Sequence, residues 1–181
     1  MARYVATMVT FAELESEAPV IAAFFRERLE TTGLSLTATT RADGWPRVSP
    51  WEAFLCDGRL YTGSMPHAVK VQDLRRDPRC CLITPLADKD DLAGEAKIFC
   101  RAREIDDTAE WERVRKAFLD LRGFDMGDFG GSHLFTYDIA GAALQRVEGD
   151  DWRTTSWTAD GGMRERIRTG ALGESRELEA Q

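Results

Sequence analysis

The sequence lacks any run of 18 apolar residues, and its first residues do not form a signal-peptide pattern. Charged residues make up 30% of the 181 residues and the net charge is −7, without a basic stripe. These features argue against a membrane-spanning helix and against a nucleic-acid partner. We therefore expect a cytoplasmic protein with one domain, residues 1–168, followed by a polar, disordered tail at 169–181.

Histidine and cysteine are also scarce. The chain has two histidines, His67 and His133, and no Gly-x-Ser-x-Gly motif, so a Ser-His-Asp hydrolase site would need a coincidence. None of the four cysteines forms a C-x-x-C pair, and no zinc or iron site is expected. We interpret the cysteines as free, buried thiols of a reducing compartment, with disulfides as the alternative.

Short strands joined by tight turns dominate the rest of the pattern. Asp43-Gly44 and Asp57-Gly58 are dipeptides that tight hairpins prefer, because glycine accepts a positive φ. Apolar or alternating segments predict strands at 34–40, 45–55, 59–63, 79–86, 95–105, 133–147 and 151–158. Helical spacing predicts helices at 16–32, 68–76 and 107–121. The fold class is therefore mainly β (β-rich α+β), an antiparallel barrel of about six strands with flanking helices.

The strand at 45–55 carries two prolines. Backbone N–H groups of alternate strand residues point the same way, so those of residues 46, 48 and 50 share one side. Pro46 and Pro50 have no N–H, and a neighbouring strand cannot pair normally on that side. The sequence thus predicts an open sheet edge, which is either an ordinary edge strand or backbone that is free to meet a ligand.

The turn that follows the strand at 59–63 is a candidate anion site. Its Gly63-Ser64 corner enters a helix, and the free N–H groups and positive dipole end of a helix N-terminus attract an anion. Lys70, in the first turn of that helix, can add a charge, and Ser64 can donate a hydroxyl. The same residues also fit an N-cap serine and a solvent-exposed lysine, so the pattern alone leaves both interpretations open.

Taken in order, the segment Thr39–Arg79 resembles the pyridoxamine-5′-phosphate-oxidase-like flavin-binding split barrels. It contains an Asp-Gly turn, Pro-Arg-Val-Ser-Pro at 46–50, Asp-Gly-x-Leu-Tyr at 57–61, a small hydroxyl residue, a lysine, and Asp-Leu-x-x-Asp-Pro-Arg at 73–79. The resemblance implies a split β-barrel that binds FMN, or alternatively coenzyme F420. It further implies an oxidoreductase that transfers hydride to or from a small-molecule substrate. A non-catalytic protein that binds or senses a flavin or a haem is the alternative.

The resemblance also implies the cofactor-binding residues. Lys70 and Ser64 would hold the cofactor phosphate. The ring system would lie beside Arg47, Val48, Ser49 and Pro50, and its edge would meet the backbone of Tyr61, Thr62 and Gly63. Arg75, Arg76 and Arg79 could meet the anionic tail of F420, or could pair with Asp73 and Asp77 instead.

Such barrels bind the cofactor at the interface of a homodimer, so the partner subunit is expected to complete the site. Its candidate residues are Trp157, Arg164 and Arg166, with Lys97 as a weaker candidate. Trp157 is equally well explained as part of a half-buried strand pair with Trp152. No catalytic side chain can be assigned, because in such a mechanism the cofactor carries the hydride. The glycine-rich segment 123–131 is expected to be a loop, either a mobile lid or an ordinary connection.

Overall fold

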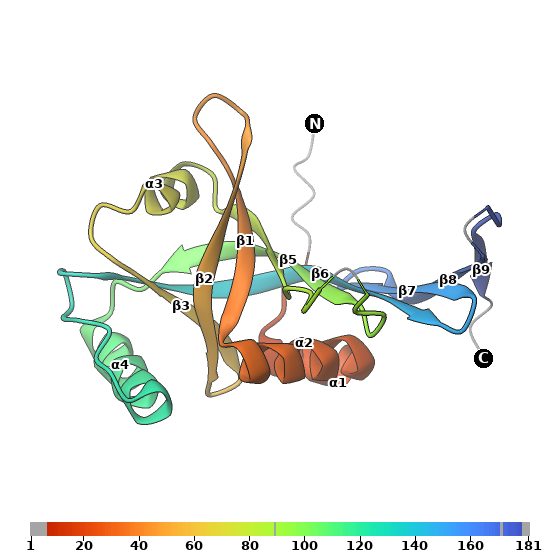
Figure 1. Cartoon of the computed structure of the whole chain (residues 1–181). Helices are drawn as coiled ribbons and strands as arrows, with labels where there is room; N and C mark the ends of the chain where they lie inside the picture. Colours follow the sequence, from red (N-terminus) through yellow and green to blue (C-terminus); the bar gives the residue numbers. More distant parts are fainter. Residues whose placement is uncertain (1–6, 89, 171, 179–181) are drawn as a thin grey trace.

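The computed structural model describes residues 7–88, 90–170 and 172–178. Six antiparallel strands form a barrel in the order β3-β2-β1-β4-β5-β6, and pairing of β3 with β6 closes it (Figure 1). These strands are β1 Leu34–Thr40, β2 Pro46–Cys56, β3 Arg59–Ser64, β4 Arg79–Ile83, β5 Glu95–Glu104 and β6 His133–Glu148. The predicted fold class, a mainly β antiparallel barrel with flanking helices, is confirmed.

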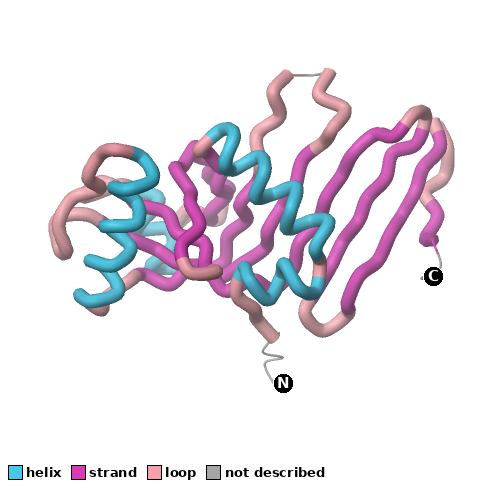
Figure 2. The backbone as a smooth tube through the Cα atoms, turned by 90° about the horizontal axis from the view of Figure 1, so that it is seen from below, coloured by secondary structure: helices cyan, strands magenta, loops and turns pink. Residues whose placement is uncertain are grey.

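Three more strands continue the sheet from β6 and run away from the barrel (Figure 2): β7 Asp151–Thr158, β8 Gly162–Thr169 and β9 Arg176–Leu178. The sequence predicted β7, but it predicted neither β8 nor a strand in the tail. In β8 only Ile167 is buried, so backbone pairing with β7 holds this strand without an apolar pattern. A disordered tail was expected from residue 169, but residues 176–178 form a strand that pairs with β8. Residues 171 and 179–181 of that tail lie outside the described residues.

Four helices flank the barrel in the described part of the chain: α1 Phe11–Glu17, α2 Pro19–Thr32, α3 Val69–Arg76 and α4 Thr108–Arg122. The helix predicted at 16–32 is confirmed from Pro19 to Thr32, but residues 16 and 17 belong to α1, a separate helix that was not predicted, and the two helices meet at Ala18. Thr10 and Glu13 form a capping box that starts α1, and Pro19, which has no N–H to donate, starts α2. None of the helices in these residues is long and apolar enough to cross a membrane.

The core has two parts. The larger part fills the barrel and the space beneath it, where α1 and α2 lie in Figure 1. The smaller part packs α4, through Trp111, Val114 and Phe118, against Phe54 of β2 and Tyr61 of β3. Consequently α4 covers one end of the barrel, while α3 packs Val71 and Leu74 into the larger core and borders the candidate site.

Strand β2 changes partner along its length. Residues 46–52 pair with β1 alone, and residues 53–56 pair with β3. Along 46–52 the second edge of β2 therefore meets no strand of the described structure, as the two prolines predicted. The strand predicted at 79–86 is too long, since β4 ends at Ile83, two residues before Pro85.

Candidate functional site

The side chain of Trp51 joins the three backbone segments of the site. Trp51 lies on β2 and is 3% exposed. Its indole N–H donates a hydrogen bond to the carbonyl oxygen of Gly63, at the end of β3. The Lys70 ammonium, from the first turn of α3, lies 4.2 Å from the centre of the Trp51 ring. The open edge of β2, the end of β3 and the N-terminus of α3 therefore meet around one indole.

Lys70 and Ser64 both have unused binding capacity here. Lys70 Nζ donates to the Pro50 carbonyl oxygen at 3.3 Å, and the described structure gives the ammonium no carboxylate partner. Burial lowers the pKa of Lys70 below its ordinary value. The Ser64 hydroxyl is buried without a hydrogen-bond partner. The N-cap of α3 is Ala68, so the interpretation of Ser64 as an N-cap residue is wrong.

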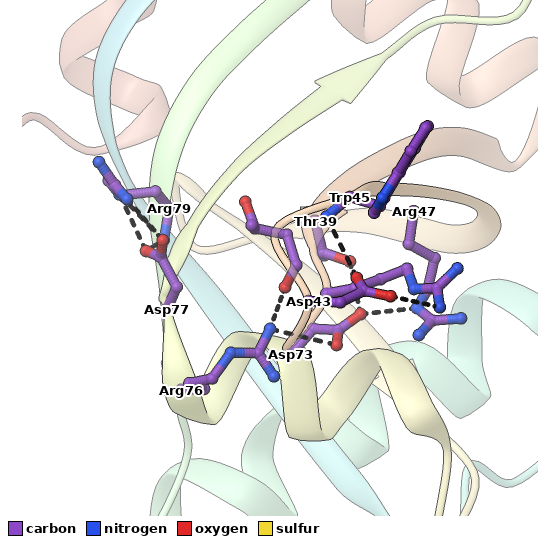
Figure 3. A network of polar contacts seen from close by, with 10 residues as sticks. Thr39, Asp43, Trp45, Arg47, Asp73, Arg76, Asp77 and Arg79 are labelled. Carbon is purple, nitrogen blue, oxygen red and sulfur yellow. Dashed lines mark hydrogen bonds and ion pairs between the residues drawn. The ribbon is translucent and has the colours of Figure 1, made fainter.

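A buried carboxylate ties α3 to the open strand (Figure 3). The Asp73 side chain on α3, which is 3% exposed, accepts hydrogen bonds from Arg47 Nε at 2.6 Å and from Thr39 Oγ1 at 3.0 Å. Arg76 lies 3.4 Å from its other oxygen. Burial by itself raises the pKa of Asp73, but the bonds from Arg47 and Thr39 outweigh it and hold that pKa below its usual value. Asp73 thus fixes the helix that carries Lys70.

The three arginines considered for a cofactor tail are all paired with acids. Arg75 binds Glu104 through two bonds of 2.7 Å, and Arg79 binds Asp77 at 2.6 Å. The Arg76–Asp73 contact and the Arg79–Asp77 pair confirm the predicted partners, whereas Arg75 pairs with Glu104 of β5 and not with Asp73 or Asp77.

The β3 residues turn their side chains away from an incoming ligand. Tyr61 is buried and donates to Glu110 at 3.1 Å, and the Thr62 hydroxyl shares a hydrogen bond of 2.6 Å with Tyr137. A Cβ placed on Gly63 would come within 3.0 Å of the Met126 side chain. Tyr61 and Thr62 also pair with β2 on one side and with β6 on the other, so only the end of β3, at Gly63 and Ser64, borders the open edge of β2. The expected backbone contacts of Tyr61 and Thr62 with a cofactor therefore stay a prediction, and the 123–131 loop reaches Gly63.

The remaining candidates lie elsewhere in the protomer. Lys97 on β5 pairs with Glu95, and Trp157 on β7 is 2% exposed in the larger core. Arg164 lies on β8 opposite Ser156, on the strands that lead away from the barrel (Figures 1 and 2). One protomer therefore does not bring Trp157 and Arg164 to Lys70, and their expected role across a dimer interface stays a prediction.

The cysteines and acids provide no metal centre in the part of the chain that the structure describes. All four cysteines are free, as predicted, but only Cys100 is fully buried, and the other three are partly exposed. Cys80 and Cys100 face one another on β4 and β5 with their Sγ atoms 3.5 Å apart. Burial raises the pKa of the Cys100 thiol well above its usual value, which keeps it protonated and unreactive.

Two residues of the site, Trp51 and Met126, have no role in the sequence prediction, and the ion pair of Asp73 with Arg47 was not predicted either. Trp51 follows Pro50 directly and alternates with Arg47 and Ser49, so strand period alone could have placed it on the face that lines the site. Asp73 stands in the quoted Asp-Leu motif, but nothing local shows that it meets β1 and β2. No sequence signal connects Met126 to Gly63.

Known proteins share this fold. The family model described as "Pyridoxamine 5'-phosphate oxidase" matches residues 21–145. No curated protein matches the chain significantly. The solved structure of Campylobacter jejuni ChuZ superposes with a TM-score of 0.65 at 12% identity, covering 89% of this chain and 67% of that one.

Two further solved structures show the same fold at low identity. A Clostridium acetobutylicum protein related to general stress protein 26, of the pyridoxinephosphate oxidase family, has a TM-score of 0.55 at 13% identity over 76% of this chain and 94% of its own. A heme binding protein from Mycobacterium smegmatis has a TM-score of 0.52 at 13% identity, with coverage of 86% and 90%. The family match spans more than half of the sequence and the barrel matches it, so this chain belongs to the pyridoxamine 5′-phosphate oxidase-like split-barrel family.

Proposed function

We propose that this protein is an FMN-dependent oxidoreductase that transfers hydride to or from a small organic substrate. The observation that carries the proposal is the arrangement around Trp51: a half-buried Lys70 ammonium without a carboxylate, beside an unpaired strand edge. A half-buried cation such as Lys70 favours an anionic ligand when no carboxylate of the described structure pairs with it, and FMN offers a phosphate. Membership of a family that commonly binds FMN or F420 supports the assignment.

The residues present fit such a cofactor. Lys70 would hold the phosphate by charge, and the unpartnered Ser64 hydroxyl would donate to it. The open edge of β2 and the backbone at Gly63 would lie along the ring system, where backbone groups can orient it. When bound, the flavin supplies the hydride chemistry. The chain would bind and orient the ring, and the Met126 loop would help to exclude water.

Coenzyme F420 is the alternative cofactor. Its polyglutamate tail would need free basic groups, and Arg75, Arg76 and Arg79 are already paired with carboxylates. This pairing favours FMN. A non-catalytic flavin- or haem-binding protein is the second candidate function, because the M. smegmatis heme binding protein shares the fold. Turnover of a nicotinamide donor by the FMN-loaded protein would separate an enzyme from a binding protein.

The test of the phosphate role is the substitution Lys70→Ala. Loss of a charge-assisted hydrogen bond of roughly 1.5–3 kcal/mol should weaken FMN binding about 10- to 100-fold. Lys70→Arg should recover part of the affinity, because charge matters more than shape for a single phosphate. Dissociation constants are measured by titrating FMN and F420 separately into the apo proteins.

The matched control is Lys116→Ala, since Lys116 is an exposed lysine of α4 that pairs with Asp120. This variant should bind FMN like the wild type. Folding of every variant is checked by thermal unfolding, which the Lys70 changes should hardly affect. Equal FMN affinities for wild type and folded Lys70→Ala would reject the phosphate role.

A further inference from the structure

A cavity of about 450 Å³ lies beyond the cofactor corner, between the C-terminal half of α3, the start of α4 and the segment that enters β6. Trp51, Ser64 and Lys70 do not line it, and the nearest link to the cofactor corner is His133, which lines the cavity and pairs with Ser64 between β6 and β3. Its size falls in the range of small-molecule sites, which span roughly 300–1,000 Å³. The cavity is therefore a second place where this chain could take a small ligand.

One wall of the cavity is aromatic. Trp111 of α4 and Phe129 of the 123–131 loop meet edge to face, with ring centres 5.7 Å apart. Trp111 is 1% exposed, and its indole N–H is buried without a hydrogen-bond partner in the described structure. A buried donor without an acceptor is costly, so a ligand whose acceptor atom reached this N–H would gain a hydrogen bond that the protein alone does not provide. Phe129 is 41% exposed and offers a face or an edge to a flat ring.

The opposite wall is polar and its charges are largely cancelled. Glu104 accepts from both Arg75, at 2.7 Å, and His133 Nδ1, at 2.9 Å. Arg75 holds the pKa of Glu104 below its usual value, so this carboxylate is ionised at neutral pH. Asp106, which also lines the cavity, has no ion-pair partner among the described side chains. Asp106 is thus the lining acid whose charge no described side chain neutralises.

We propose that this cavity binds a flat heteroaromatic molecule that is neutral or cationic and carries a hydrogen-bond acceptor for Trp111. The aromatic wall selects a ring, the unpartnered indole N–H selects an acceptor, and Asp106 disfavours anions. These preferences are opposite to those of the Lys70 corner, which favours a phosphate. The site goes beyond the proposed function, because it needs no flavin.

The test uses three flat probes of similar shape and different charge: nicotinate, nicotinamide and 1-methylnicotinamide. The chain has five tryptophans, so their indole N–H signals can be followed by two-dimensional ¹H–¹⁵N NMR on the full-length protein. Trp111→Phe identifies the Trp111 signal by its loss. Nicotinamide and 1-methylnicotinamide should shift this signal, and nicotinate should bind most weakly. The shifts should persist when FMN is present.

Substitutions test the two recognition elements. Trp111→Phe keeps an aromatic ring and removes the donor, so nicotinamide binding should weaken roughly 2- to 10-fold. Trp157→Phe is its control, because Trp157 is equally buried but lies in the other core. Asp106→Asn should reduce the preference for 1-methylnicotinamide over nicotinate, whereas Asp120→Asn on the exposed face of α4 should not.

Three outcomes would overturn the proposal. The first is an unmoved Trp111 signal with all probes, and the second is nicotinate binding as tightly as its neutral and cationic counterparts. The third is loss of the shifts once FMN is added, which would place the cavity within the cofactor site. Failure of FMN to bind at Lys70 would leave these measurements unaffected, so the two proposals fail independently.

Discussion

At the scale of single residues, the candidate site depends on charges that are removed from water. Among the described residues Lys70 has no counter-ion and is therefore available to a ligand, whereas Arg47 is held by the buried Asp73. Lys70 and Arg47 lie on neighbouring elements, but Lys70 can bind a ligand whereas Arg47 stabilises the fold. Arg47 and Asp73 brace α3 against β2, and this brace sets the place of Lys70 three residues earlier on the helix. A structural ion pair thus supports a binding residue.

Replacement of Asp73 by Asn should show how much the ion pair of Asp73 with Arg47 stabilises the fold. The change keeps the shape and removes charge-assisted bonds to Arg47 and Arg76, so the free energy of unfolding should fall by about 1–3 kcal/mol at neutral pH. Because the folded-state pKa of Asp73 is lowered, its contribution is complete above the unfolded carboxyl pKa of about 4 and is lost as pH falls through the lower folded value.

Urea unfolding at pH 7 and near pH 3 checks this expectation, with the wild type and Asp73→Asn drawing closer at the acidic pH. Asp120→Asn serves as the control, since Asp120 is exposed and its ion pair contributes little at either pH. A constant difference between wild type and Asp73→Asn across this range would show that the carboxylate charge is not what stabilises the fold.

At the scale of elements, the 123–131 loop connects the candidate cofactor site with the cavity beside Trp111. Met126 contacts the site at Gly63, while Phe129 lines the cavity beside Trp111. The loop is anchored by Arg115, which binds Asp125 at 2.7 Å and lies 3.0 Å from Asp128. An anchored loop that reaches a ligand site can close further over a ligand without a large rearrangement.

We expect the amides of residues 123–131 to exchange more slowly with solvent when FMN is bound. Closure of Met126 over the cofactor would restrict opening of the loop, which is what slow exchange reports. Hydrogen–deuterium exchange with and without FMN measures this change. The exposed hairpin turn at 41–45 is the internal reference, and its exchange should stay constant. Unchanged protection of the loop on saturation with FMN, and again with substrate, would make it an ordinary connection.

At the scale of the whole molecule, apolar side chains remain exposed around the open edge of β2. Trp45, in the turn before β2, is 69% exposed, and Val48 of β2 is 60% exposed. Met65 and Val69, beside the Lys70 corner, are 79% and 59% exposed. Water contact with several large apolar residues in neighbouring segments is unfavourable, and a second copy of the chain could cover them.

We therefore expect an isologous dimer with its cofactor sites between the subunits. Light scattering at micromolar concentration should give twice the chain mass of 20.3 kDa. Val69→Glu should shift the equilibrium toward monomer, because it places a charge in the apolar surface. Val20→Glu, at a 46% exposed position on α2, should leave the dimer intact. A mass of one chain for the wild type would contradict the dimer.

Local sequence predicted much of the barrel because its signals are short-range. Asp43-Gly44 and Asp57-Gly58 gave two hairpins, and the strand at 34–40 has the predicted bounds. The errors arose where local signals were weak or misleading. The apolar spacing after Ser16 hid the break at Ala18, and the charged strand β8 has no apolar alternation. Both features depend on packing and backbone pairing with distant segments.

For the site, the sequence by itself determined the chemical groups: two prolines that open a strand edge, a lysine at a helix N-terminus, and a serine in the turn before it. Only the tertiary structure decided which of these groups are free. It buried Trp51 between them, bound Arg47 to Asp73 and left Lys70 without a carboxylate. The reason is physical: residue type and spacing set what a segment can bind, whereas desolvation and pairing depend on which distant segments pack against it.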